Sequence, residues 1–392
     1  MDMKKFKTLL IFLLAFIILS QPVAALAGVS YFEPSQAKFV TVKTAERNGK
    51  IMAPFKKIFQ SFGAVVSWNE ITKTSSARND NFKVSVKIGE RTATVNGSTV
   101  NLSAAAEILN GGTYVPIDLI TSLKGIVNSK DVNNNFKIWD SNVFIKNHGW
   151  TQLSDGFIAH AGGGLYATVN GKKVEHIYTN SMEALESSYK NGHRVFEIDF
   201  QMTSDGRFAA VHEWDEVGGK KTSEEWGNYK IAGMYKGLFL EDIYKFMLKY
   251  KDTFLVTDTK AFYHTAQNIK KQFNQIADVA KSMDESLLYR VIPQVYDQNC
   301  YKILMEVYPF DSVIYTLYAS PDSNKEVVDF VAKHDNIKVV TMGSYRYKKD
   351  FYQQLNKLSK YIYFFTINVP QEIETFKTWG VHGFYTDYIK PK

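Results

Sequence analysis

The sequence predicts an α/β protein: a (β/α)8 TIM barrel preceded by a small α+β domain. From Gly149 onward, short apolar runs typical of strands alternate with longer amphipathic stretches typical of helices, and this repetition favours a parallel sheet. About 240 residues follow this point, close to the usual length of an eight-stranded barrel. The main rival is an open doubly wound sheet, but no glycine-rich dinucleotide loop follows the first run.

Nine runs are candidate strands, one more than a barrel needs, so one is surplus or the barrel has an extra strand. The second and third runs have no helix between them, and Ser204-Asp205-Gly206 predicts a tight turn there. The nine are Phe157–His160, Arg194–Phe200, Phe208–His212, Phe254–Asp258, Val291–Tyr296, Val313–Tyr318, Lys338–Met342, Tyr361–Asn368 and Gly383–Thr386. Helical patterns between them include Ser181–Asn191, Leu240–Tyr250 and Ala266–Met283.

The region before the barrel, residues 28–148, contains a repeated unit. In Ile51–Gly63 and again in Thr113–Gly125, a short extended apolar segment meets a proline, and a helical pattern then runs to a glycine. Proline suits the first turn of a helix, and glycine suits the position after its end. Between the copies, apolar and polar residues alternate from Phe82 to Ile88, which predicts a half-buried strand, and Asn96-Gly97 predicts a hairpin turn.

The first 27 residues have the pattern of a secretory signal peptide. Lysines precede an apolar run from Leu9 to Leu19, and Ala25-Leu26-Ala27 forms a small-residue cleavage site. These 11 apolar residues are too few to cross a bilayer, which needs about 20. We therefore expect a protein with no transmembrane span that is secreted, extracellular or associated with the cell envelope, and whose mature chain starts near Gly28.

Composition limits the class of protein further. With 45% hydrophobic residues, the chain is not globally disordered. A single cysteine, Cys300, excludes a disulfide framework and any cysteine-rich metal site. The net charge of +7 suits an anionic envelope or phosphate-bearing substrates, although a solvated basic surface with no partner has the same signature. We expect no nucleic-acid partner.

Polar side chains stand at the ends of the first four candidate strands. They are His160, Glu197, Asp199, His212, Asp258 and Lys260. Glu197 and Asp199 are two residues apart on one strand, so both carboxylates face the same side. In a barrel, all six would collect at the end where the strands terminate, which is where barrel active sites form.

This set of side chains indicates phosphodiester chemistry. Three converging carboxylates repel one another, and a hard divalent cation such as Ca²⁺ or Mg²⁺ relieves that repulsion. Two imidazoles supply a general base and a general acid, and either histidine fits either role. A metal together with Lys260 would neutralise phosphate oxygens. Each residue alone is a common structural feature, whereas their joint order at strand ends is hard to obtain by accident.

Residues 157–390 resemble the glycerophosphodiester phosphodiesterase family, within the phospholipase C-like phosphodiesterase superfamily. The family pattern is His-Arg, then Glu-x-Asp, then His, and this chain has His160-Ala161, Glu197-Ile198-Asp199 and His212. The flanks also match at Thr179–Ala184, Thr203–Gly206, Phe365–Asn368 and Gly380–Asp387.

The resemblance implies a role for each residue. His160 and His212 would be the acid/base pair, and Lys260 would contact the substrate phosphate. The divalent cation would be held by Glu197, Asp199 and Asp258. Two departures from the family pattern concern substrate and metal contacts: Ala161 replaces the usual arginine and cannot supply its bidentate phosphate contact, and Asp258 replaces a longer glutamate.

The region before the barrel resembles the copper amine oxidase N-terminal-like stalk domain of exported bacterial proteins, over roughly residues 39–140. The resemblance rests on the repeated unit, Val65–Asn69 and Thr94–Gly97. No histidine or cysteine precedes His148 in this region, so no copper site is expected. It implies a module for presentation or for cell-wall or envelope association. We set the domain limits at 1–27, 28–148 and 149–392.

Together these observations predict a secreted, metal-dependent phosphodiesterase acting on glycerophosphodiesters or related cell-envelope phosphodiesters, small or polymeric. The alternative is a non-catalytic envelope protein that binds anionic phosphate polymers. A third interpretation, phospholipase C or D chemistry on membrane lipid as in a lysin, is closer to the first and predicts an exposed apolar rim.

Overall fold

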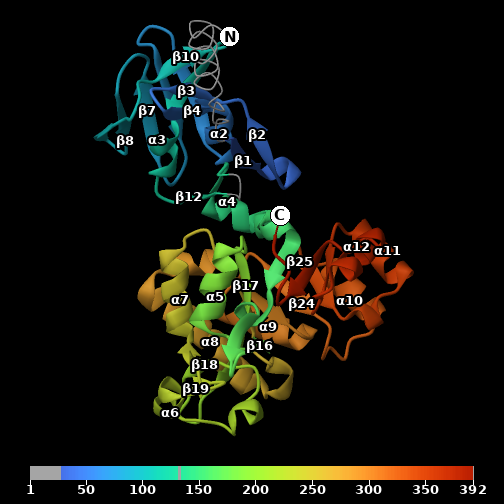
Figure 1. Ribbon diagram of the computed structural model, residues 1–392. Helices are drawn as coiled ribbons and strands as arrows, with labels where there is room; N and C mark the ends of the chain where they lie inside the picture. The colour runs from blue at the N-terminus through green and yellow to red at the C-terminus, as the bar shows by residue number, and fades with distance from the viewer. Residues whose placement is uncertain (1–27, 131–133, 392) are drawn as a thin grey trace, which may run out of the picture.

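A computed structural model describes residues 28–130 and 134–391. The signal peptide predicted for residues 1–27 lies outside the described residues. A β-rich amino-terminal region packs against one end of a larger α/β region, and helix α4 (Ser141–Lys146) lies between them (Figure 1). Among the described helices, none combines the length and the apolar character needed to cross a membrane.

The amino-terminal region contains three antiparallel or mixed sheets. The first has the order β12 (Ile126–Lys130), β13 (Phe136–Asp140), β1 (Val29–Glu33) and β2 (Lys38–Val42). The second has the order β10 (Glu107–Leu109), β11 (Gly112–Pro116), β4 (Lys50–Pro54) and β3 (Ala45–Arg47). The third is a meander of β5 (Val65–Asn69), β6 (Thr74–Arg78), β7 (Lys83–Lys87), β8 (Thr92–Val95) and β9 (Ser98–Asn101).

The repeated unit predicted from the sequence is present. Strand β4 leads into α2 (Phe55–Ser61) and β11 leads into α3 (Ile117–Thr121), with a proline immediately before each helix. The two strands pair antiparallel, so the copies meet at the centre of one sheet. The glycine after each helix has a left-handed backbone, with φ of +70° at Gly63 and +81° at Gly125, which explains glycine at both positions.

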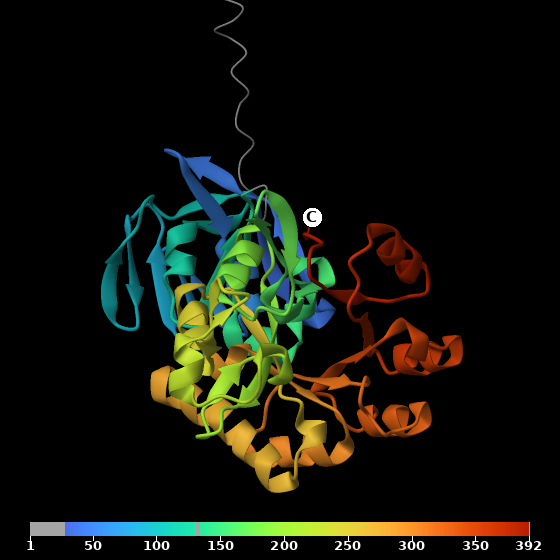
Figure 2. The same ribbon diagram turned by 60° about the horizontal axis from the view of Figure 1, so that its bottom comes forward.

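The carboxy-terminal region is a closed barrel of eight parallel strands, as the sequence predicts. Strand β14 pairs with both β17 and β27, which closes the ring. The strands are β14 (Phe157–Ala159), β17 (Val195–Met202), β22 (Phe254–Asp258), β23 (Val291–Val295), β24 (Val313–Thr316), β25 (Ile337–Met342), β26 (Tyr361–Phe364) and β27 (Gly383–Thr386). The helices surround them (Figure 2): α5 (Met182–Lys190), α7 (Leu240–Lys249), α8 (Ala266–Met283), α9 (Gln298–Val307), α10 (Asn324–Val331), α11 (Lys349–Lys357) and α12 (Pro370–Thr378).

The surplus strand is β18 (Phe208–Ala210), and the sequence interpretation of His212 as the end of a barrel strand was wrong. Strand β18 pairs antiparallel with β17 and with β21 (Leu238–Phe239). The short turn through Gly206 can join only antiparallel neighbours, because a parallel partner needs a long crossover. This excursion also carries α6 (Ser223–Asn228), β19 (Lys230–Ile231) and β20 (Tyr235–Lys236).

An unpredicted hairpin follows the first barrel strand. It consists of β15 (Leu165–Val169) and β16 (Lys172–His176), joined by Asn170-Gly171, and it pairs with no other strand. Asn-Gly is a common hairpin turn. Because the hairpin follows the carboxyl end of β14, it lies at the same end of the barrel as Glu197, Asp199 and Asp258.

The other end of the barrel is closed by aromatic side chains. Trp139 stacks on Phe144 with ring centres 4.8 Å apart, and Phe144 packs on Phe254 of β22 at 5.7 Å. One buried cluster continues from these residues through Phe32 and Trp150 into the interior of the barrel. A side chain at Gly149 would meet the Phe144 ring at 2.3 Å, so only glycine allows this packing.

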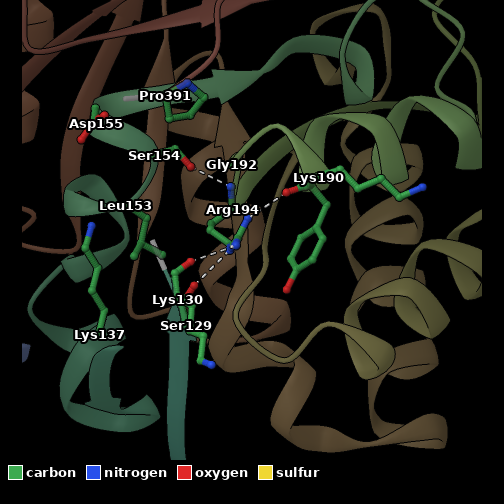
Figure 3. A pocket seen from close by; sticks show the side chains of 11 residues that line it. Ser129, Lys130, Lys137, Leu153, Ser154, Asp155, Lys190, Gly192, Arg194 and Pro391 are labelled. Carbon is green, nitrogen blue, oxygen red and sulfur yellow. Dashed lines mark hydrogen bonds between the residues drawn. The ribbon is translucent and has the colours of Figure 1, made fainter. Parts of the chain in front are cut away.

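Arg194 joins the two regions at the start of β17. Its Nε donates to Asp252 Oδ2 at 2.7 Å and to Ser129 Oγ of β12 at 3.1 Å, and a terminal nitrogen reaches the Lys130 carbonyl at 3.5 Å. Figure 3 shows this side chain in the cleft between the regions. Arg194, immediately before β17, is therefore hydrogen-bonded both to the barrel region, through Asp252, and to the amino-terminal region, through Ser129.

Replacing Arg194 with glutamine should lower the free energy of unfolding by about 2 kcal/mol, because Asp252 would remain buried without its charged donor. Urea unfolding at pH 7 measures the change. Arg207→Gln is the matched control, since its ion pair with Glu241 is 45% and 30% exposed and such pairs contribute little. Equal losses in the two variants would contradict this assignment.

His193 should make the protein less stable in mild acid. It is buried, and its Nε2 donates to the carbonyl of Ile389 at 3.0 Å, while burial lowers its pKa to about 4. The unfolded chain binds a proton near pH 6.5 and the folded chain only near pH 4, so stability is lost as the pH falls through this window. Between pH 7 and 5, the wild type should lose about 2 kcal/mol more than His193→Gln in urea unfolding. Parallel losses would show that His193 is not the cause.

Candidate active site

Three buried carboxylates meet at the mouth of the barrel. Asp199 of β17 lies directly opposite Asp258 of β22, and Glu197 lies two residues earlier on β17. These side chains are only 1–5% exposed, and one oxygen from each lies within 4.8 Å of the other two. Among the described residues, these three form the group of histidine, cysteine, aspartate or glutamate side chains that lie close enough together to hold a metal ion.

Lys260 lies among these acids. Its Nζ is 2.9 Å from Asp199 Oδ1 and 2.6 Å from Asp258 Oδ2. Burial lowers the pKa of Lys260, but the two carboxylates outweigh burial and raise it. Burial likewise raises the pKa of Asp199, but Lys260 outweighs it and holds that pKa well below its usual range. Burial and the charge of Asp199 raise the pKa of Glu197.

Polar neighbours fix the orientation of each acid. The Ala161 amide donates to Glu197 Oε2 at 2.8 Å. Asn180 donates to Asp199 Oδ2 at 3.1 Å and accepts from the Asp199 amide at 3.0 Å. Asp258 accepts from the hydroxyls of Tyr296 and Tyr318. The carboxylates are therefore held in place before any ligand binds.

His160 follows β14 and is oriented by Asp387. Its Nδ1 lies 2.9 Å from Asp387 Oδ1, and Asn368 donates to the other oxygen of Asp387 at 2.7 Å. This pairing assigns the Nδ1 proton to the Asp387 side and leaves Nε2 toward the mouth. Burial lowers the pKa of His160, but Asp387 and Glu197 outweigh it and raise the pKa to about 9.

His212 reaches the same mouth from the excursion beyond β18. Its Nδ1 lies 2.8 Å from Glu216 Oε1. Tyr178 lies between the two histidines: its ring stacks on His212 at 4.1 Å and meets the edge of His160 at 4.8 Å. Tyr178 has a left-handed backbone, with φ of 56°, which is uncommon for a bulky residue.

All six residues predicted from the sequence lie at one end of the barrel, and the roles assigned to them stay predictions. Sequence reasoning missed Asp387, Tyr178 and Asn180 as parts of the site. The closing motif Thr386-Asp387 at the end of the last strand was a usable signal for Asp387. Nothing in the sequence singled out Tyr178, because its contacts exist only once two distant segments meet.

A barrel mouth with three carboxylates, two imidazoles and a lysine has the chemistry of a phosphoric ester hydrolase. A family model described as the glycerophosphoryl diester phosphodiesterase family matches residues 162–390, which is more than half of the chain. The chain therefore belongs to this family and is a phosphoric diester hydrolase. A second model, described as the copper amine oxidase N-terminal domain, matches residues 32–138. A search of curated proteins finds no match.

Solved structures of glycerophosphodiester phosphodiesterases are similar to this chain. One from Parabacteroides distasonis is 20% identical, with a TM-score of 0.48 over 60% of this chain and 93% of its own. A Thermotoga maritima enzyme is 16% identical, with a TM-score of 0.44 over 59% and 94%. An Oleispira antarctica phosphodiesterase, solved with its product sn-glycerol-3-phosphate, is 15% identical, with a TM-score of 0.47 over 59% and 92%.

Asp387→Asn should lower kcat/KM for a soluble glycerophosphodiester by a factor on the order of 10²–10⁴, because the neutral amide no longer orients the His160 ring through its Nδ1 proton. Glu216→Gln is the matched change at His212. Its effect should stay below about tenfold, since Glu216 is 50% exposed whereas Asp387 is 4% exposed. Steady-state kinetics with both variants measure this difference. Equal effects, or no effect of Asp387→Asn, would contradict the orienting role.

Proposed function

We propose that this chain is a secreted, metal-dependent phosphodiesterase that hydrolyses glycerophosphodiesters or related cell-envelope phosphodiesters. The observation that carries the proposal is the convergence of Glu197, Asp199 and Asp258 within 4.8 Å, beside His160 and His212. Membership of the glycerophosphoryl diester phosphodiesterase family supports the same reaction.

The acidic residues fit a divalent cation. Three buried carboxylates carry more negative charge than the single ammonium of Lys260 balances, and carboxylate oxygens are the ligands that Ca²⁺ and Mg²⁺ prefer. Glu197, Asp199 and Asp258 would hold the ion. When bound, the ion would act as a Lewis acid on a phosphoryl oxygen.

The side chains of this protein supply the proton transfers. One imidazole would accept a proton from the attacking water as its oxygen bonds to phosphorus, and the other would protonate the leaving alkoxide as the P–O ester bond breaks. The products are a phosphomonoester and an alcohol. Lys260 would release one of its carboxylates to contact the phosphate. Tyr178 would keep the two imidazoles apart and on the same side of the mouth.

The proposed location rests on the amino-terminal sequence pattern and on the amino-terminal domain. The pattern of residues 1–27 supports export through a cleaved signal peptide. The amino-terminal domain supports association with the cell envelope, since it packs on the closed end of the barrel and leaves the mouth open. Mass spectrometry of the protein recovered outside the cell, with an amino terminus near Gly28, tests export directly.

Hydrolysis of glycerophosphocholine should stop when a chelator removes divalent metal and should return when Ca²⁺ or Mg²⁺ is added back. Glu197→Gln and His212→Ala should each lower kcat at least about 100-fold, because one weakens the cation site and the other removes a proton carrier. Circular dichroism checks that both variants fold.

Activity that persists in chelator would refute the metal, and full activity in His212→Ala would refute the acid/base assignment. If the wild type binds anionic phosphate polymers but hydrolyses no diester, the non-catalytic alternative is correct.

A further inference from the structure

Exposed apolar side chains gather at the mouth of the barrel. From Gly149 to the end of the described residues, nine large hydrophobic side chains are exposed, and eight of them lie on segments that follow the carboxyl ends of barrel strands. They are Tyr166, Val169, Val174, Ile177, Met234, Tyr263, Tyr345 and Val369. The ninth, Trp379, follows α12 and stacks on Tyr347. Most natural surfaces scatter such residues, so this clustering calls for a cause.

Six of the eight belong to neighbouring loops on one side of the mouth. These six residues follow β14, β25 and β26. In the barrel the four strands β14, β27, β26 and β25 are consecutive neighbours, so the loops after them are adjacent. We call the four loops after these strands, residues 160–181, 343–348, 365–369 and 387–391, the docking arc. Within it, Tyr345 is 78% exposed and Tyr166 is 48% exposed. Tyr166 stacks on Tyr388, which joins the first and last loops of the arc.

The hairpin of β15 and β16 is the most prominent part of the arc. Ala167 lies opposite Val174 and Val169 lies opposite Lys172, so Val169 and Val174 are on the same face. Both valines are at least 37% exposed. A two-stranded hairpin is only marginally stable in water, and this one pairs with no further strand. Burying the face that carries Val169 and Val174 against another apolar surface would therefore stabilise the hairpin.

The charge of the arc is positive. Lys172, Lys173, Lys348 and Lys390 are exposed on it, and Arg346 donates to loop carbonyls. Its two acids are Glu175 and Asp387, and Asp387 is turned inward to His160. The segment after β17 differs, because residues 203–237 hold six acidic and five basic side chains. Aliphatic and aromatic side chains beside lysines match an anionic lipid surface.

The amino-terminal region does not cover this surface. The amino-terminal region packs on the opposite end of the barrel through Trp139, Phe144 and Phe254 (Figure 1). The arc borders the mouth on the side that contains His160 and Asp387, so a membrane surface that covers the arc would place its headgroups beside these side chains.

We propose that the docking arc binds the surface of an anionic lipid bilayer and that the substrates include phosphodiesters carried by lipids in that surface. The substrate part of this inference rests on the proposed phosphodiesterase function, whereas the binding part does not.

Vesicle sedimentation tests the binding. The chain from Gly28 is used, because it contains all the described residues and lacks the apolar run Leu9–Leu19, which would itself enter lipid. Vesicles contain phosphatidylcholine alone or phosphatidylcholine with phosphatidylglycerol. We expect stronger binding to the anionic vesicles, and at least about tenfold weaker binding after Lys172→Gln, Lys173→Gln and Lys348→Gln are combined, since each lysine near such a surface contributes roughly fivefold.

The apolar part of the arc has its own variant and a matched control. Combining Val169→Ser, Val174→Ser and Tyr345→Ser should weaken binding about tenfold. Combining Val65→Ser, Ile71→Ser and Ile108→Ser, three exposed side chains of the amino-terminal region, should leave binding unchanged. Wild-type protein that stays in solution with both vesicles, or an arc variant that binds as well as the control, would overturn the docking proposal.

Turnover separates this proposal from the proposed function. Both arc variants should hydrolyse soluble glycerophosphocholine at the wild-type rate, but should hydrolyse a vesicle-bound lysophospholipid several-fold more slowly. Wild type that binds vesicles and hydrolyses no diester would overturn the phosphodiesterase function and leave docking in place. Wild type that hydrolyses glycerophosphocholine alone, with no turnover of vesicle lipid, would overturn the lipid-borne substrate.

Discussion

The structure depends on how the barrel accommodates three buried carboxyl groups. Glu197, Asp199 and Asp258 lie where parallel strands end, with almost no exposure to water. Carboxylates this close repel, and burial makes each charge more costly. Lys260 offsets part of this cost through contacts of 2.9 and 2.6 Å to the two aspartates. The remaining negative charge suits the mouth to a divalent cation, and that cation together with Lys260 would offset the charge of an anionic phosphodiester.

The two ends of the barrel divide structural and chemical roles. At the closed end, Trp139, Phe144 and Phe254 form an apolar plug that continues into the barrel interior. Arg194 anchors the first residues of β17, the strand that carries two of the acids. Apolar packing at one end therefore holds the strands that bring charged groups together at the other. At the mouth, the side chains of His160 and His212 remain 12% and 23% exposed, and the proposed docking arc lies beside them.

Local sequence signals predicted much of this arrangement. Apolar runs gave the eight parallel strands, and the order of polar residues at their ends located six side chains of the site. The prediction failed where the structure depends on which strands pair or on contacts between residues distant in sequence. Phe208–Ala210 has the composition of a barrel strand, but its short connection to β17 makes it antiparallel. The contacts of Tyr178 with both histidines, and of Asp387 with His160, join residues far apart in sequence, so no local pattern reveals them.

Calorimetric titration of the metal-free protein with Ca²⁺ and with Mg²⁺ tests the central claim most directly. If the three acids form one cation site, one ion should bind per chain, and the heat of binding should disappear in Asp199→Asn while folding is retained. The absence of binding by both ions, or binding that is unchanged in Asp199→Asn, would contradict the account.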